Sequence, residues 1–142
     1  MNLLDVNVLV YAHREDVPER DRYRAWLESH INGDAAFGIC DLVLSGFLRI
    51  VTHPKVFAAP SPLDQALDFS REVREAPACV VITPGRRHWG IFLGLCRGAG
   101  GRGNLNPDAY LAALAIESGS DWITTDRDFA RFPGLRWRHP LG

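Results

Sequence analysis

Residues 1–13 read MNLLDVNVLVYAH, and this stretch indicates the fold class of the chain. The segment Met1–Leu4 is short and largely apolar, which predicts a buried strand that ends at Asp5. A helical turn is expected over the next residues, Val6–His13. A carboxylate at the end of a buried strand needs a partner, because burying an unpaired charge is costly. Asp5 is therefore the first residue at which chemistry is expected.

Downstream, short apolar runs alternate with longer amphipathic ones. Further strands are expected at Ala36–Cys40, Cys79–Thr83, Trp122–Thr124 and, at a sheet edge, Arg136–Arg138. Helices are expected from Pro18 to Ile31, over Leu42–Thr52 with Asp41 as N-cap, from Ser61 to about Glu75, after Gly85, from Asn106 to Ser118 and over Asp126–Phe132. This alternation predicts a three-layer α/β/α sandwich with a mainly parallel central sheet of four to five strands. The length of 142 residues suits a single domain over residues 1–142.

Composition excludes several classes of protein. There are 16 basic and 17 acidic residues, for a formal net charge of -1, which excludes a highly basic nucleic-acid coat protein. The three cysteines are widely spaced and show no pattern of metal ligands, so small buried thiols in a reducing compartment are expected. No apolar run approaches the ~20 residues that span a bilayer, and the start of the chain lacks the features of a signal peptide. We predict a cytoplasmic protein without a membrane partner.

Four aspartates occupy places where a parallel sheet collects functional groups. Asp5 ends the first strand, Asp126 and Asp128 follow the strand Trp122–Thr124, and Asp108 lies in the first turn of the preceding helix. The carboxyl ends of parallel strands meet at one edge, so these carboxylates are expected within a few ångströms of one another. Like charges so placed repel unless a cation lies between them. Carboxylates and water are the ligands of Mg²⁺ or Mn²⁺, and such sites act on phosphate groups.

Each aspartate also has a structural explanation. Asp108 at the start of a helix is favoured by the helix dipole whatever its function. Asp126 is a suitable N-cap for the last short helix, and Asp128 is a suitable acid for its first turn. Asp5 is the hardest of the four to explain in this way, because its neighbours are apolar.

Several segments together resemble a known family, the PIN-domain nucleases, and more narrowly the VapC toxins of bacterial toxin–antitoxin modules. The segments that carry the resemblance are Asp5-Val6-Asn7-Val8-Leu9, Pro107-Asp108-Ala109, Thr124-Thr125-Asp126-Arg127-Asp128-Phe129, Phe47-Leu48-Arg49-Ile50-Val51-Thr52-His53-Pro54 and Phe132-Pro133-Gly134-Leu135-Arg136-Trp137. The match spans nearly the whole chain, and the ordered set of aspartate motifs is its most specific part.

The resemblance implies a PIN-like fold and a Mg²⁺- or Mn²⁺-dependent endoribonuclease toxin that acts on tRNA or another structured RNA. It implies that Asp5, Asp108 and Asp126 hold the metal and are catalytic, with Asp128 a further ligand or a group that positions water. The supporting residues are Asn7, which would orient Asp5, and Thr124, which would lie beside the site. It also implies a VapB-type antitoxin partner and a homodimer, for which the apolar helices over Tyr23–Ile31 and Phe47–Val51 are the candidate contact surfaces.

One position departs from the family. A glutamate is common on the third helical segment, where this chain has Gly46. Fewer carboxylates should weaken metal binding, which leaves open a catalytically impaired PIN-like module that binds RNA or a protein partner. A phosphatase or another small-molecule hydrolase that uses the acidic cluster is a third interpretation.

Arg102 in the Gly-rich stretch and three arginines before it are candidate contacts to the RNA backbone, since phosphate contacts supply much of the affinity for nucleic acids, and each is alternatively a solvated surface charge. The four candidates are Arg86, Arg87, Arg97 and Arg102. The Gly-rich stretch itself, Gly98–Gly103, matches GxGxxG, but a helical pattern rather than a strand precedes it. No dinucleotide cofactor is therefore expected.

Overall fold

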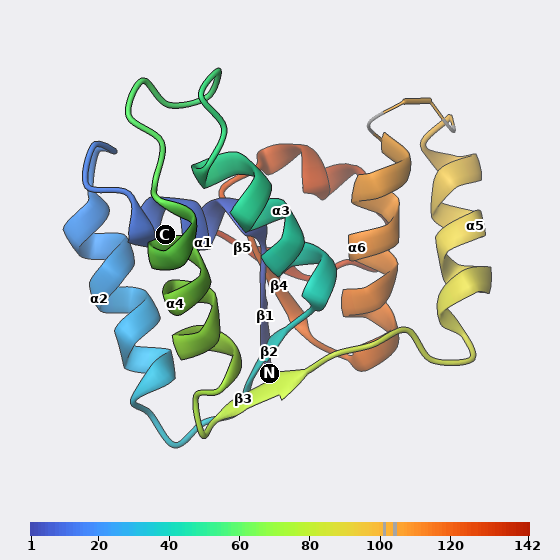
Figure 1. Cartoon of the computed structure of the whole chain (residues 1–142). Coiled ribbons are helices and arrows are strands. Elements are labelled where there is room, and N and C mark those ends of the chain that lie inside the picture. The colour runs from blue at the N-terminus through green and yellow to red at the C-terminus, as the bar shows by residue number, and fades with distance from the viewer. Residues whose placement is uncertain (101, 104) are drawn as a thin grey trace.

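The protein folds around a five-stranded sheet flanked by helices (Figure 1). A computed structural model describes residues 1–100, 102–103 and 105–142. The strands are β1 (Asn2–Leu4), β2 (Phe37–Ile39), β3 (Cys79–Val81), β4 (Asp121–Ile123) and β5 (Trp137–Arg138). The helices are α1 (Val6–His13), α2 (Arg20–Ile31), α3 (Asp41–Val51), α4 (Leu63–Arg74), α5 (His88–Gly98), α6 (Leu105–Ser118) and the 3₁₀ helix η1 (Arg127–Arg131).

The sheet has the strand order β3-β2-β1-β4-β5, and every pair of neighbours is parallel. Leu3 of β1 pairs with Gly38 on one side and with Trp122 on the other, which places β1 at the centre. All carboxyl ends therefore lie at one edge, with Asp5 directly beyond the central strand. The predicted α/β/α sandwich with a parallel sheet is confirmed.

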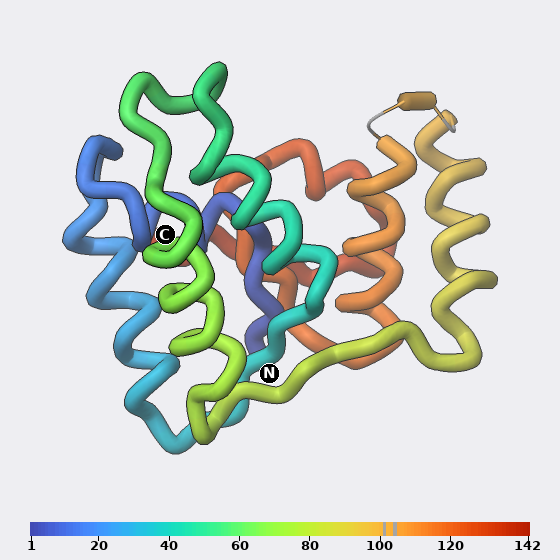
Figure 2. The backbone as a smooth tube through the Cα atoms, viewed as in Figure 1, coloured from blue at the N-terminus to red at the C-terminus, as the bar shows by residue number. Residues whose placement is uncertain are grey.

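The strand order also explains the two helical layers. Steps from β1 to β2 and on to β3 move in one direction, whereas the step from β3 to β4 returns past β1. Because parallel crossovers are right-handed, the two directions put their helices on opposite faces. Helices α1 to α4 lie on one side of the sheet, and α5 and α6 on the other (Figure 1). In Figure 2 the last two run side by side in opposite directions.

The core is built from the inward faces of both layers and the strands between them. Its largest fully buried side chains include Trp122, Phe37 and Phe47. The helix that contains Phe47 packs against α1 and α4, so this layer is held together by contacts between its helices as well as with the sheet. No helix in the described part of the chain is long and apolar enough to cross a membrane.

Several predicted boundaries change. The segment Val6–His13, expected as a turn, is a complete eight-residue helix. The prediction that Asp41 caps α3 is wrong, because the extended residue Cys40 occupies the N-cap and Asp41 is already helical. The Asp41 carboxylate instead accepts from Arg74 Nε at 2.8 Å. The Gly-rich stretch begins at the last residue of α5, and Gly101 within it lies outside the described residues.

Candidate metal centre at the carboxyl edge of the sheet

Asp5 links the central strand to the first helix and is buried, with 5% of its surface exposed. It is the N-cap of α1, and its Oδ1 accepts from the Val6 N–H at 2.7 Å. Its Oδ2 accepts from the Thr124 hydroxyl at 2.6 Å. Both carboxylate oxygens are thus held by donors that favour the ionised form.

Thr124 joins the ends of two neighbouring strands. It is fully buried directly after β4, and its Oγ1 also accepts from the Asp126 N–H at 3.0 Å. Asp126 in turn caps η1, because its Oδ1 accepts from the Asp128 N–H at 2.9 Å. A continuous run of hydrogen bonds therefore connects Asp5 through Thr124 to Asp126. The N-cap role predicted for Asp126 is confirmed, and it leaves the second oxygen, Oδ2, outside the cap.

Asp108 approaches from the opposite layer, in the first turn of α6. Burial raises the pKa of its carboxyl, and the charges of Asp126 and Asp128 add to this effect while Arg131 opposes it. Burial likewise raises the pKa of Asp5 from 3.8 to about 6. The bonds from Thr124 and the Val6 amide lower that pKa in part, whereas the charges of Asp108 and Asp126 raise it again. Three carboxylates thus lie within one another's electrostatic field.

The arrangement fits a divalent cation in its chemistry, although the predicted close cluster is not formed. Among the described residues, no three His, Cys, Asp or Glu side chains form a group that could hold a metal ion as they are placed. The expectation of carboxylates within a few ångströms is therefore corrected. Thr124 and Val6 engage both oxygens of Asp5, and Asp126 caps η1 through one of its oxygens. Neighbouring carboxylates are nevertheless stabilised by a cation such as Mg²⁺, because the cation offsets the repulsion between their charges.

Asp128 and Asn7, which the resemblance also assigns to the site, are less closely connected to Asp5. The Asp128 side chain is 71% exposed and pairs with Arg131 at 3.6 Å. A hydrogen bond from Asn7 to Asp5 is not among those of the described residues, so the prediction that Asn7 orients Asp5 is wrong here. Thr124 and the backbone N–H of Val6 make those contacts instead. The sequence could indicate the contact from Thr124, because its hydroxyl lies at the end of a buried strand. It could not indicate the contact from the Val6 N–H, because every residue except proline has such a donor.

Gly46 lies where α3 comes closest to the start of α1. A Cβ atom at this position would lie 3.2 Å from Cγ2 of Val6, the residue directly after Asp5. The position is partly exposed. A longer side chain at position 46 would therefore start beside the acidic edge, and the glycine leaves that edge without a carboxylate from α3.

The four candidate arginines separate into two pairs. Glu117, near the end of α6, accepts from the Gly85 N–H at 2.6 Å and from the Arg87 N–H at 2.9 Å. Arg86 and Arg87 thus lie at the end of α6 opposite to Asp108, about 14 Å along its axis from that residue.

Arg97 lies in the last turn of α5, and Arg102 follows in the connection to α6. Because α5 and α6 pack in opposite directions, this second pair is at the end of the layer that holds Asp108 (Figure 2). The structure therefore brings only half of the four towards the acidic edge. Arg131, which sequence reasoning missed, acts on Asp108. The i,i+3 spacing of Arg131 from Asp128 could have indicated from the sequence that this arginine lies beside the acidic residues.

The chain matches the family model for the PIN domain over residues 3–135. It is 46% identical over 141 residues to VapC ribonuclease Mb2897 of Mycobacterium bovis, a match that covers 99% of this chain and 96% of the relative. It is 39% identical over 140 residues to ribonuclease VapC25 of Mycobacterium tuberculosis, with 99% of both chains covered.

Solved structures give the same picture of the fold. A chain in the crystal structure of VapBC2 from Rickettsia felis, bound to a DNA fragment from their promoter, superposes with a TM-score of 0.69 at 18% identity and covers 97% of both chains. A chain of VapBC-1 from nontypeable Haemophilus influenzae gives 0.68 at 17% identity, covering 99% of this chain and 98% of that one. At such identities these structures establish a shared fold.

Proposed function

Because the chain belongs to the PIN-domain family and, within it, to the VapC ribonucleases, we propose that it is a toxin that hydrolyses RNA phosphodiester bonds. The observation that carries this proposal is the buried Asp5 carboxylate at the end of the central strand, linked through Thr124 to Asp126, with the charges of Asp108 and Asp126 acting on it. Residues 1–142 are taken as a single PIN-like domain, of which the family match covers most. The proposed substrate is tRNA or another structured RNA.

Asp5, Asp108 and Asp126, with Asp128 at the margin, are the residues that would hold Mg²⁺ or Mn²⁺. Such an ion, when bound, polarises the phosphoryl oxygen and lowers the pKa of a bound water. The Val6 amide and the Thr124 hydroxyl fix both oxygens of Asp5. Burial of Asp5 excludes water from its carboxylate, so this group offers a strong field to a cation.

In the proposed reaction, the oxygen of water forms a bond to phosphorus and the bond from phosphorus to the 3′ oxygen breaks. The departing 3′ oxygen takes up a proton, which leaves a 3′-hydroxyl and a 5′-phosphate. Arg97 and Arg102 lie at the end of the α5–α6 layer nearest to Asp108, so they are the stronger candidates for contact with the RNA backbone. Arg86 and Arg87 would contact only RNA that extends along the length of α6.

We propose a VapB-type antitoxin and a second copy of the chain as protein partners in the cytoplasm. The structurally similar chains described above come from VapBC2 of Rickettsia felis and VapBC-1 of nontypeable Haemophilus influenzae, which supports the first. The helices first considered for the dimer turn their apolar residues inward, since Tyr23, Leu27, Phe47 and Val51 are buried.

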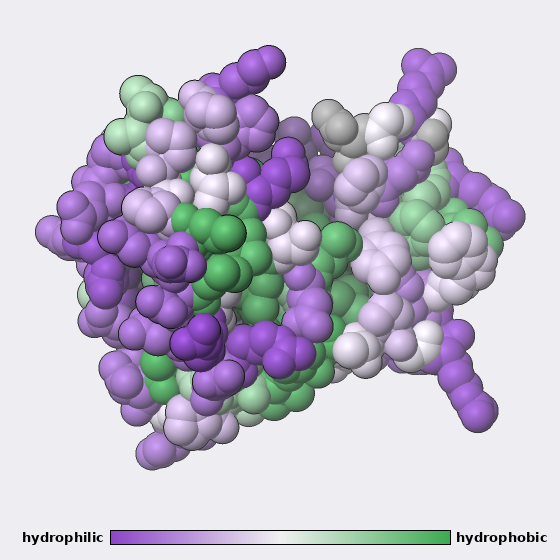
Figure 3. All heavy atoms as spheres, in the orientation of Figure 1, coloured by the Kyte–Doolittle hydropathy of each residue, from purple (hydrophilic) through white to green (hydrophobic). Residues whose placement is uncertain are grey.

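Exposed apolar side chains on α3, α4 and β3 are alternative contacts for the dimer, and Figure 3 shows apolar areas on this face with hydrophilic side chains between them. These exposed residues are Leu42, Leu63, Leu67 and Val80.

A second candidate function is a catalytically impaired module that binds RNA or a protein. Gly46 favours it, because the glycine faces Val6 beside the acidic edge and adds no carboxylate there. The two functions differ in one measurable respect, which is metal-dependent turnover.

The decisive experiment is RNA cleavage by the isolated chain with Mg²⁺ or Mn²⁺, compared with Asp108→Asn and a matched control, Asp64→Asn. Asp64 also lies in the first turn of a helix but is exposed on α4. We expect cleavage by the wild type and by Asp64→Asn. Asp108→Asn should lose more cleavage activity than the roughly 10- to 100-fold that is typical when a residue around a metal site is changed. Equal cleavage by all three proteins would contradict the assignment of Asp108 to the active site. If all three proteins bind RNA and none cleaves it, the impaired module is favoured.

A further inference from the structure

Arg131, the last residue of η1, lies beside the acidic edge of the sheet. Burial and the charges of Asp126 and Asp128 raise the pKa of Asp108, whereas the charge of Arg131 lowers it. Within the described part of the chain, Arg131 is the one cation that acts on the Asp108 carboxylate. The proposed nuclease activity gives this residue no role so far.

The guanidinium group of Arg131 is bonded at one nitrogen and open at the other two. Its Nε donates to the backbone carbonyl oxygen of Asp128 at 2.9 Å, which fixes the direction of the side chain. Its Nη2 lies 3.6 Å from Oδ2 of Asp128, which is an ion pair but too long for a hydrogen bond. Neither terminal nitrogen makes a hydrogen bond to a residue that the structure describes. The side chain is 38% exposed, so a ligand can approach it.

Two other arginine–aspartate pairs of the protein are bonded more completely. Arg74 donates to Asp41 through Nε at 2.8 Å and through Nη2 at 3.3 Å. Arg136 donates to Asp121 through Nε at 2.7 Å. These hydrogen bonds lower the pKa of both aspartates. Arg131 donates instead to a carbonyl oxygen, which carries no full charge, so its own positive charge is less completely offset.

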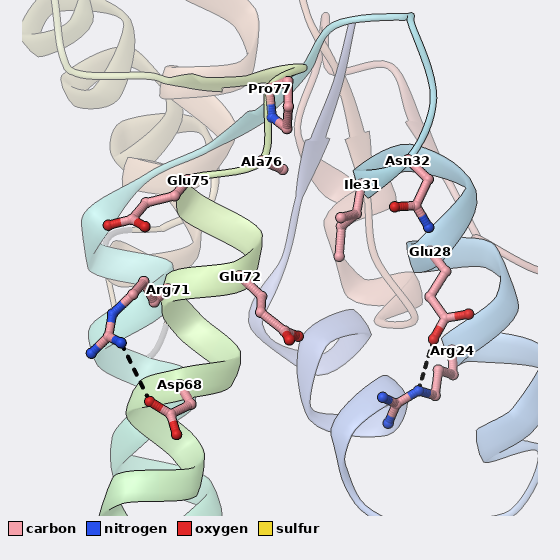
Figure 4. A pocket seen from close by; sticks show the side chains of 10 residues that line it. All are labelled: Arg24, Glu28, Ile31, Asn32, Asp68, Arg71, Glu72, Glu75, Ala76 and Pro77. Carbon is pink, nitrogen blue, oxygen red and sulfur yellow. Dashed lines mark hydrogen bonds and ion pairs between the residues drawn. The ribbon is translucent and has the colours of Figure 1, made fainter.

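Arg71 and Asp68 on α4 provide a reference pair with the same spacing along the chain. Nη1 of Arg71 lies 3.5 Å from Oδ1 of Asp68, so this pair also lacks a hydrogen bond of good length. It borders the hollow between α2 and α4 (Figure 4). Arg71 is in the last turn of α4, which leads into β3, so it lies towards the amino edge of the sheet. The pair therefore resembles that of Arg131 in geometry but is remote from the acidic edge.

Two groups of arginines approach Asp108 from different elements. Arg131 approaches from η1, whereas Arg97 and Arg102 lie at the end of α5 and in the connection that follows it. In Figure 1 the start of α6, which carries Asp108, is drawn between η1 and the end of α5. An RNA backbone that contacts both groups would therefore pass over Asp108.

We propose that the terminal nitrogens of Arg131 bind the phosphate group whose ester bond is hydrolysed at the acidic edge. The inference rests on the proposed nuclease function and adds a catalytic residue to it. A planar guanidinium group can donate to two phosphate oxygens at once. Four ionised carboxylates carry twice the charge of one divalent ion, so the edge repels a phosphate group unless a further cation is present. Arg131 supplies that cation and stabilises the charge that develops on the phosphate oxygens during attack by water.

The test compares Arg131→Gln with the wild type and with Arg71→Gln, using mixed tRNA and Mn²⁺. Arg131→Gln should lower kcat by about 100-fold, as is found when one donor to a developing negative charge is removed. Its Mn²⁺ affinity, measured by calorimetry without RNA, should rise by about threefold to tenfold, because a positive charge beside Asp108 is lost. Loss of fold would lower both quantities, so opposite changes identify a contact with the substrate. Arg71→Gln should change neither.

Binding of tRNA in EDTA gives a readout that does not depend on cleavage. The slope of log affinity against log salt concentration should be smaller by roughly 0.7 to 0.9 in Arg131→Gln, which corresponds to one lost phosphate contact. Arg131→Lys keeps the charge without the planar pair of donors. It should therefore keep the wild-type slope and recover only part of kcat.

The outcomes separate this inference from the nuclease function on which it rests. If the wild type cleaves tRNA and Arg131→Gln cleaves it equally well, the inference is wrong and the nuclease function stands. If the wild type binds tRNA without cleaving it and the slope falls only in Arg131→Gln, the nuclease function is wrong and the phosphate contact stands. Parallel losses of kcat and of Mn²⁺ affinity would also overturn the inference, because they would assign Arg131 to holding η1 and Asp128 in place.

Discussion

The two ends of α1 carry opposite charges, although they are only about 12 Å apart. At its start the helix is capped by a buried carboxylate, Asp5, and at its end His13 faces three guanidinium groups. Both arrangements agree with the helix dipole, which favours anions at the start and cations at the end. One short helix therefore supports an acidic region and a basic region at once.

The two regions differ in how the chain assembles them. The acidic edge comes from residues that directly follow parallel strands, so the topology of the sheet brings Asp5 and Asp126 together. The basic region at the end of α1 is lined by residues of α1, α2, α4 and the irregular connection before α4, so only the packing of helices forms it. A region assembled by topology can be predicted from sequence patterns, whereas one assembled by helix packing needs the structure.

The largest expected effect concerns the pH dependence of stability at the acidic end. The pKa of Asp5 is raised from 3.8 to about 6 in the folded protein, so folding favours its protonated form. Its contribution to stability is fully present below pH 3.8 and is lost as the pH rises through about 6. The metal-free protein should therefore lose about 3 kcal/mol through this group over that interval.

Urea unfolding in EDTA between pH 4 and 7.5, compared with Asp5→Asn, measures this contribution. Asparagine keeps an acceptor for the Val6 N–H and cannot ionise, so the stability of the variant relative to wild type should rise with pH. If the difference in unfolding free energy between the two proteins stays constant across this pH range, Asp5 is ionised throughout. The start of α1 would then not destabilise the protein as the pH rises. Addition of Mn²⁺ should remove most of the difference in pH dependence.

Next in size is the effect of Thr124→Val, which removes the hydroxyl between the two strand ends. The change leaves Asp5 Oδ2 and the Asp126 N–H without the partner they share. We expect a loss of about 10- to 100-fold in RNA cleavage and in Mn²⁺ affinity, as is usual for groups that orient metal ligands. Thr125→Val is the matched control, and Thr124→Ser should restore most of the function. Equal losses in the two valine variants would mean that the fold, and not the hydroxyl, was affected.

The sequence predicted the sheet and the acidic residues because both depend on short local patterns. Apolar runs that end in Asp5 and Asp126 define strand ends, and a parallel sheet then requires them to share an edge. The predicted contact from Asn7 is not among the hydrogen bonds of the described residues, and Asp5 Oδ1 instead accepts from the backbone N–H of Val6. A backbone donor can be assigned only when the path of the chain is known.

The arginines show the same limit more clearly. Arg87 and Arg97 are ten residues apart on the chain, and only the direction of α5 relative to α6 decides which is closer to Asp108. Arg20 drew no attention in the sequence, because an arginine at the start of a polar helix is normally solvated. Its Nε is nevertheless buried, and burial of this kind follows from tertiary packing and not from a local pattern.

The smallest of the three effects tests the missing carboxylate at Gly46. Gly46→Glu should add a negative charge beside Asp5 and raise Mn²⁺ affinity by about tenfold relative to Gly46→Gln, which has the same size. Both variants bring a Cβ atom to within 3.2 Å of Val6, so the strain is common to them and cancels in the comparison. In EDTA the glutamate variant should be the less stable of the two, because it adds repulsion to Asp5 and Asp108, whose pKa values are already raised by burial and by neighbouring charges. Equal Mn²⁺ affinities, measured by calorimetry, would show that position 46 does not face the cation. The acidic end of α1 would then be complete without α3, and the glycine would serve the close contact with Val6 alone.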